Sequence, residues 1–270
     1  MDSFDASKSE LIHYWTDLGT ESIEFTLAQA RLYRNFPKFN IAFSPSRLKK
    51  GNVMAQSIIF RQFKDYFPAG TIHICNTSFV SAQSRRFIIC KFLDQWFLGP
   101  DNGLFHLGFN DPDIEYYRIN NNHFDKDALG EIYIPAVRLL IENPQKPLNE
   151  LFDPKTVMLK PFFVQPVINE KNIRITCLYI DHEGSAYFNI TKNEFDEIRN
   201  GRNVRFRMLT GTIYGIRNQA EDVDEGEIVA YFDWGNILKL TQNSGNFSKH
   251  LAIYENSQII VEFSESKNLL

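Results

Sequence analysis

The sequence predicts an α/β N-terminal domain with a mainly parallel sheet, followed by a small all-β, barrel-like C-terminal domain. Three observations lead to this prediction. Strand-like and helix-like segments alternate up to Asn143, a proline-rich stretch follows, and short β-rich segments fill the chain from Asn172 onward. Alternating strands and helices are typical of a parallel sheet covered on both faces, whereas closely spaced short strands are typical of a small barrel. We place the boundary near residue 160, which gives domains 1–160 and 161–270.

In the first domain, the spacing of apolar residues predicts each element in turn. A helix over Glu21–Phe36 stops at Pro37, and its candidate apolar positions are Ile23, Leu27, Ala30 and Leu32. A second helix over 52–66 is broken by Pro68-Ala69-Gly70. The other predicted elements are strands over 12–16, 40–43 and 71–75, a hairpin of 86–93 with 95–98 around Asp94, and a helix over about 132–142.

The second half of the chain has a different pattern. Five prolines between Pro144 and Pro166 indicate a linker that crosses a surface. Beyond the linker, the predicted strands are 173–180, 186–190, 204–209, 227–232, 237–241 and 258–263, separated by Gly, Asn and Asp.

Composition limits the classes of function. The chain has 270 residues, 43% of them hydrophobic, and a net charge of −4, which gives no electrostatic reason to expect a nucleic-acid partner. No segment is long and apolar enough to cross a bilayer, and the polar N-terminus does not resemble a signal peptide. The cysteines, Cys75, Cys90 and Cys177, are odd in number and widely spaced, which favours reduced thiols. We therefore expect a cytoplasmic protein without a membrane partner or metal site.

Four segments carry a resemblance to a known family. They are Thr16-Asp17-Leu18-Gly19, then Phe67 to His73 (FPAGTIH), then Phe97 to Gly103 (FLGPDNG), and Gly226 to Ala230 (GEIVA) with Leu238 to Asn246 (LKLTQNSGN). In order and spacing they are similar to the T-D-F-G, F-P-x-G-T-V-H, F-V-G-P-D-N-G, G-E-x-x-A and L-E-I-A-x-N-x-G motifs of S-adenosylmethionine hydroxide adenosyltransferases. The chain thus resembles that family, whose fold is shared with the S-adenosylmethionine-dependent chlorinases and fluorinases.

The resemblance implies an architecture and a reaction. Family members are homotrimers in which adenosine lies between the N-domain of one subunit and the C-domain of its neighbour. Water or hydroxide attacks the 5′ carbon of S-adenosylmethionine, and methionine leaves. Because the sulfonium is already an activated leaving group, the resemblance implies no metal or other cofactor. The expected ligand is S-adenosylmethionine or adenosine.

Substrate-binding residues follow from the motifs. Asp17 ends a predicted parallel strand, where open α/β sheets bind ligands, and a carboxylate accepts hydrogen bonds from both ribose hydroxyls. The alternative role for Asp17 is an N-cap of the first helix. The resemblance adds Asn102, Asp181, Asn189, Asn243 and Asn246 as substrate-binding candidates. For Asp181 the alternative is a turn, and for Asn243 and Asn246 it is a capping role.

The water-activating residues of the family are largely missing. Aligned from Gly70-Thr71 without gaps, the family Asp falls on Ser78 and the Arg on Arg85; anchored on Pro135, the family His falls on Ala128. His123 lies five residues before Ala128, and a local insertion would bring it into the family position; the alternative is a solvent-facing loop histidine. The catalytic candidates are therefore Arg85, Ser78 and His123.

Two classes of function follow. The first is an enzyme that cleaves S-adenosylmethionine to adenosine and methionine, with a slow rate because the general base is replaced. The second is a catalytically impaired trimer, a pseudoenzyme that binds a nucleoside or another ligand, or that has a structural role without a ligand. A third interpretation is a different nucleophile, with Ser78 lining an anion pocket.

Overall fold

The structure is a computed structural model that describes residues 10–45, 48, 51–77, 86–109, 111–120, 127–154, 164–208 and 211–265. The chain forms two compact units, which are described separately below. Unit 1 comprises Met1–Ser57 and Lys64–Pro161, and unit 2 comprises Ile58–Phe63 and Phe162–Leu270.

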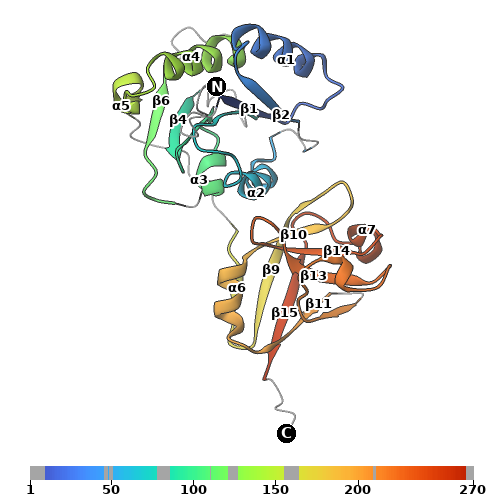
Figure 1. The fold of residues 1–270 in the computed structure, drawn as a ribbon. Coiled ribbons are helices and arrows are strands. Elements are labelled where there is room, and N and C mark those ends of the chain that lie inside the picture. Colours follow the sequence, from blue (N-terminus) through green and yellow to red (C-terminus); the bar gives the residue numbers. More distant parts are fainter. Residues whose placement is uncertain are drawn as a thin grey trace, which may run out of the picture. The chain divides into compact units, whose positions relative to one another are not determined.

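Unit 1 is built on a sheet whose seven strands, among the described residues, lie in the order β2-β1-β3-β5-β4-β6-β7 (Figure 1). Strands β2, β1, β3 and β5 are mutually parallel, β4 is antiparallel to β5, and β6, antiparallel to β4, returns to the direction of β5. Five strands thus share one direction, which confirms the mainly parallel sheet. The strands are β1 (Leu11–Thr16), β2 (Asn40–Pro45), β3 (Ile72–Asn76), β4 (Phe87–Phe92), β5 (Gln95–Pro100), β6 (Tyr116–Ile119) and β7 (Asp153–Pro154).

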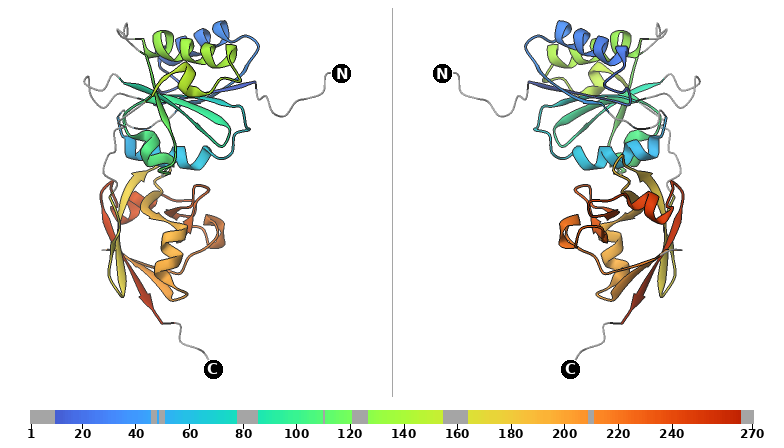
Figure 2. Two further views of the ribbon diagram at one scale, coloured as in Figure 1. Left: turned by 90° about the vertical axis from the view of Figure 1, so that its left-hand side faces the viewer. Right: turned by 90° about the vertical axis from the view of Figure 1, so that its right-hand side faces the viewer.

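Helices cover both faces of this sheet. In Figure 2, α1 and α4 lie over one face, whereas α3 and the start of α2 lie under the other. The strand order therefore places the connection β1–α1–β2 on one face and the connection β2–α2–β3 on the opposite face. The helices are α1 (Ile23–Asn35), α2 (Val53–Phe63), α3 (Leu104–Phe109), η1 (Leu129–Tyr133), α4 (Ile134–Glu142) and α5 (Leu148–Leu151).

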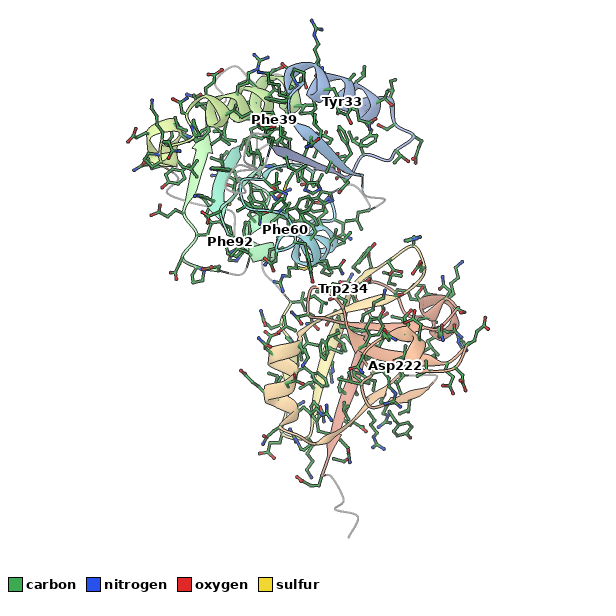
Figure 3. All side chains as sticks on the ribbon, in the orientation of Figure 1. Tyr33, Phe39, Phe60, Phe92, Asp222 and Trp234 are labelled. Carbon is green, nitrogen blue, oxygen red and sulfur yellow. The ribbon has the colours of Figure 1, made fainter. Side chains whose placement is uncertain are left out.

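The buried face of α1 differs from the predicted one. Phe25, Ala28 and Leu32 face the core. Ile23 and Leu27, two of the predicted core positions, are 64% and 55% exposed, and Ala30 is exposed as well. The helix carries apolar residues on two sides, and periodicity alone does not tell which side meets the sheet. Tyr33, labelled in Figure 3, is also half exposed.

The predicted linker begins later than expected. Leu148 of α5 and Phe152 are buried in the core of unit 1. Strand β7 pairs with β6 through Tyr117↔Pro154 and Arg118↔Asp153. The residues up to Pro154 therefore belong to the sheet domain, because two apolar side chains and an edge pairing hold them there. The hairpin of β4 and β5 matches its prediction, and Leu93 and Asp94 in its turn both have positive φ, at 47° and 56°.

Unit 2 is an antiparallel sheet of eight strands among the described residues, in the order β12-β11-β15-β9-β10-β14-β13 with β8 beside β9. It curls into a near-barrel, which confirms the predicted class of this domain. Its strands are β8 (Val167–Ile168), β9 (Asn172–Ile180), β10 (Ala186–Thr191), β11 (Asn203–Arg207), β12 (Thr212–Tyr214), β13 (Ile228–Phe232), β14 (Ile237–Gln242) and β15 (Gln258–Ser264).

Three helical segments of unit 2 were not predicted: α6 (Lys192–Arg199), η2 (Ala220–Asp222) and α7 (Phe247–Leu251). The sequence does carry a signal for α6, because Thr191 and Glu194 form a capping box at its start. The helix buries only Phe195, so its apolar periodicity is weak. Within the part of the chain that the structure describes, no helix is long and apolar enough to cross a membrane.

Candidate active site

The carboxyl ends of the parallel strands in unit 1 bring several polar residues to one edge of the sheet. Asp17 follows β1, Thr77 follows β3, and Asn102 follows β5. Strands β1 and β3 are neighbours, yet the chain leaves β1 through α1 on one face and enters β3 from α2 on the other. This is a topological switch point, where open α/β sheets form their ligand-binding crevice. Asp17 and Thr77 flank it.

Asp17 is not the cap of α1. Ser22 occupies that position, and its Oγ accepts a hydrogen bond of 3.2 Å from the backbone N–H of Phe25. The N-cap alternative for Asp17 is therefore wrong. The Asp17 carboxylate is partly exposed, and its Oδ2 accepts a hydrogen bond of 3.1 Å from Gln56 Nε2 of α2.

The Gly-Pro-Asp-Asn-Gly segment at the end of β5 is held by hydrogen bonds and close packing. Asn102 is 2% exposed; its Oδ1 accepts from the backbone N–H of Leu104 at 3.0 Å, and its Nδ2 lies 3.4 Å from Thr77 Oγ1. A Cβ atom on Gly99 would lie 2.9 Å from the ring of Phe105, and Gly103 has a φ of 93°. The glycines are thus required by packing and by backbone conformation. The segment leads from β5 into α3, and the contact of Asn102 with Thr77 ties it to the end of β3.

A chain of hydrogen bonds runs through the interior of the same unit. Gln95 Nε2 donates to the carbonyl of Lys64, which turns Gln95 Oε1 toward His73 Nε2 at 2.7 Å. His73 Nδ1 lies 2.9 Å from His13 Nδ1, and His13 Nε2 lies 2.8 Å from Ser44 Oγ. If both rings are neutral, these contacts fix one direction: Ser44 donates to His13, His13 to His73, and His73 to Gln95.

Burial keeps both histidines neutral. His13 is 1% exposed and His73 is fully buried, and the rings stack on Phe67 and Phe97. Desolvation, together with the neighbouring His73, lowers the pKa of His13 to about 3. Desolvation also lowers the pKa of His73 to about 4, although its hydrogen bond with Gln95 opposes the shift. This pair is a poor proton acceptor at neutral pH and acts as an internal hydrogen-bonding chain.

In unit 2, the Asp181 carboxylate is already engaged by four donors. Its Oδ1 accepts from the backbone N–H groups of Glu183 and Ser185, at 3.1 and 2.9 Å. Its Oδ2 accepts from Tyr187 Oη at 3.2 Å and lies 3.4 Å from Lys239 Nζ. Asp181 therefore begins the turn between β9 and β10, as the alternative interpretation expected.

The other predicted residues of unit 2 also make internal contacts. Asn189 is 2% exposed and joins the backbone N–H of Thr176 to the carbonyl of Val164, both at 2.7 Å. Asn243 Nδ2 donates to the carbonyl of Val223 at 2.9 Å. Asn246 caps α7, with its Oδ1 accepting from the backbone N–H of Lys249 at 2.9 Å.

The structure brings two of these sequence-distant segments together. Gly184, in the turn that Asp181 begins, has a φ of 89°, and a Cβ there would lie 2.3 Å from the side chain of Asn246. Ser185 Oγ lies 2.8 Å from Thr241 Oγ1 in the same region. The two motif segments of the C-terminal domain thus form one loop cluster.

The predicted catalytic residues Ser78, Arg85 and His123 lie outside the described residues. Ala128, on which the alignment anchored at Pro135 places the family histidine, is buried in the core of unit 1. Sequence reasoning missed Gln56 and Thr77. Gln56 lies within an apolar helical pattern and carries no motif, so no local signal marks it. Among the described residues, no three His, Cys, Asp or Glu side chains are arranged to hold a metal ion.

Comparisons with known proteins agree with this fold. The SAM hydroxide adenosyltransferase N-terminal domain model matches residues 12–133, and the SAM hydroxide adenosyltransferase C-terminal domain model matches residues 175–260. An uncharacterized conserved protein from Thermotoga maritima has a similar crystal structure, with a TM-score of 0.77 and 23% identity over 93% of this chain and 99% of that one. A conserved hypothetical protein from Thermus thermophilus gives a TM-score of 0.67 and 18% identity over 94% and 99%. None of the curated proteins searched matches this chain.

An α/β domain with polar residues at its switch point, joined to an antiparallel near-barrel, defines the class of protein. Because both domain models match in order and together span most of the sequence, the chain belongs to the S-adenosylmethionine hydroxide adenosyltransferase family. The activity of that family is adenosyl transfer from S-adenosylmethionine to hydroxide.

Proposed function

We propose that this protein binds S-adenosylmethionine at the switch point of unit 1 and cleaves it to adenosine and methionine. The observation that carries the proposal is Asp17, a partly exposed carboxylate at the end of β1 that is not used as a helix cap. A carboxylate offers only acceptors, and the two ribose hydroxyls of an adenosyl group offer two donors. The family match supports this assignment.

The reaction needs positioning more than activation of the leaving group. A bond forms between the water oxygen and the 5′ carbon while the bond from that carbon to sulfur breaks, and the electron pair stays on the sulfur of methionine. The proton of the attacking water passes to a base or to solvent. In this scheme Asp17 holds the ribose in line, with Asn102 fixing the neighbouring loop.

We propose a slow rate for this step. Positioned general bases contribute about 10²–10⁴ in rate. Ser78 is not a base at neutral pH, Arg85 does not accept a proton, and Ala128 has no polar group. His123, five residues before Ala128, is the nearest histidine in the sequence, and we propose it as the residual base.

We further propose a homotrimer, in which Asp181, Asn189, Asn243 and Asn246 of one subunit complete the site of its neighbour. The support is the family assignment and the loop cluster in which the turn that Asp181 begins meets Asn246. Analytical ultracentrifugation at micromolar concentration measures the mass directly. If the protein is a monomer under these conditions, no site is shared between subunits, and only the residues of unit 1 are left as candidates.

The central experiment follows adenosine and methionine by chromatography after incubation with S-adenosylmethionine. Binding of adenosine is measured in parallel by titration calorimetry. We expect Asp17→Asn to weaken adenosine binding by about 1.5–3 kcal/mol, the usual range for a hydrogen bond to a charged group. Asp94→Asn is the matched control, because this carboxylate lies in the exposed β4–β5 turn and Asn tolerates its positive φ. Equal affinity in Asp17→Asn and the parent, or none in either, refutes the ribose role.

The outcomes also separate catalysis from binding. If the parent cleaves S-adenosylmethionine and His123→Ala does not, His123 is the general base. Adenosine binding without any release of methionine from S-adenosylmethionine supports the nucleoside-binding alternative instead. Turnover as fast as in ordinary enzymes contradicts the gap-free alignment that places Ser78 and Ala128 at the family positions.

A further inference from the structure

Within the described part of the chain, one buried polar atom beside Asp17 lacks a hydrogen-bond partner. Gln56 is fully buried, and its Nε2 donates to Asp17 Oδ2 at 3.1 Å. Its other amide atom, Oε1, has no hydrogen-bond partner among the described residues. Buried carbonyl oxygens are nearly always paired, because leaving one unpaired costs its full desolvation. An orphan of this kind calls for an explanation.

The neighbouring residues show that the position is unusual. Ser57, the next residue of α2, is also fully buried, but its Oγ donates to the carbonyl of Met54 at 2.8 Å. Tyr133 Oη is the other unpaired buried side-chain atom in the described part of the chain, and it lies within the apolar core of unit 1. Gln56 instead contacts the carboxylate at the edge of the sheet.

The orientation of Gln56 is fixed at both of its ends. Its backbone N–H donates to the carbonyl of Asn52 at 3.0 Å, so the residue is anchored in the first turn of α2. Asp17 is an acceptor, so the amide nitrogen must face it and the oxygen must face away. One amide group thus joins two acceptors: its nitrogen contacts the carboxylate of Asp17, and its oxygen is the carbonyl oxygen of Gln56. Two adjacent acceptors suit a ligand with two adjacent donors.

We propose that Gln56 is a second ligand-binding residue of this site: its Oε1 accepts the hydrogen bond of one ribose hydroxyl, Asp17 accepts that of the other, and Nε2 holds the Asp17 carboxylate. The proposal rests on the function proposed above. It makes the site selective for a vicinal diol, and it predicts discrimination against deoxyribose. A protein-internal role predicts no such discrimination, because the same atoms are then satisfied whatever the ligand.

The test is a double-mutant cycle between the protein and its ligand. Adenosine, 2′-deoxyadenosine and 3′-deoxyadenosine are titrated by calorimetry into the parent and into Gln56→Met, which keeps the length of the side chain and removes the amide. We expect Gln56→Met to weaken adenosine binding about tenfold, and to weaken binding of the analogue that lacks the contacted hydroxyl by less than about threefold. Ser57→Ala is the control, because its hydrogen bond lies within the helix, and it should show no dependence on the hydroxyls.

The results separate this inference from the proposed function. If Gln56→Met weakens all three ligands equally, Oε1 does not contact a ribose hydroxyl and the inference fails, while adenosine binding by the parent keeps the proposed function intact. If the parent binds no adenosine, both fail. Gln56→Asn, which retracts the same amide by one methylene, is measured in the same cycle in case Gln56→Met does not fold. If Gln56→Asn weakens the binding of adenosine and of both deoxy analogues by the same factor, the inference is overturned as well.

Discussion

The buried histidine pair predicts a loss of stability in acid that belongs to unit 1. In the folded protein the pKa values of His13 and His73 are lowered to about 3 and about 4, whereas the unfolded chain has the ordinary value near 6.5. Below pH 6.5 the unfolded state therefore binds protons that the folded state does not. The free energy of unfolding is fully retained above pH 6.5 and falls as the pH drops toward 4.

The size of the effect follows from the shift. Each pH unit below 6.5 costs about 1.4 kcal/mol per histidine, so at pH 5 each contributes a loss of about 2 kcal/mol and the pair about 4 kcal/mol. With a urea dependence of about 2 kcal/mol per molar, the unfolding midpoint should fall by about 2 M between pH 7 and pH 5. Such a loss is a large part of the stability of an ordinary domain.

Tryptophan fluorescence in urea measures the pH dependence of the unfolding midpoint for unit 1 alone. Trp15 and Trp96 report unit 1, and the substitution Trp234→Phe removes the third tryptophan, which lies in unit 2. In this background we expect His73→Gln to remove about half of the dependence on pH. His182→Gln, whose side chain is 73% exposed, is the control and should leave the dependence unchanged. If the urea midpoint falls by the same amount between pH 7 and pH 5 with and without His73→Gln, the argument is refuted.

Three further outcomes are expected. Asp181→Asn keeps the turn oxygen but removes the charge facing the mostly buried Lys239, and it should lower the stability of unit 2 by about 1–3 kcal/mol, measured by Trp234 fluorescence in urea. Gly99→Ala should lower the stability of unit 1 by about 1–3 kcal/mol because its Cβ position is crowded. Gly211→Ala is the control, because no atom lies within 4 Å of its Cβ position. Equal thermal midpoints in the two variants contradict this prediction. The three cysteines are buried, so a thiol reagent should modify them only after unfolding; rapid labelling of the native protein refutes their burial.

Much of the fold could be predicted from the sequence, because local patterns encode it. Every strand predicted in the two domains is present, since each has its own short apolar run between turn residues. The β4–β5 turn was marked by the change of pattern around Asp94. The family motifs identified the family, and two of their glycines have a local reason: Gly99 is closely packed and Gly103 has a positive φ.

Tertiary structure alone decided how distant residues meet. Which side of α1 faces the sheet was settled by the sheet itself, in favour of Phe25 and Leu32. The contact of Gln56 with Asp17 joins residues 39 positions apart, and the pairing of Asp181 with Lys239 likewise joins separate strands. Hydrogen bonds act over about 3 Å, and the one-dimensional order of residues does not record which side chains approach that closely. The sequence therefore determined the class of protein, and only the tertiary structure placed Gln56 of α2 beside Asp17 at the end of β1.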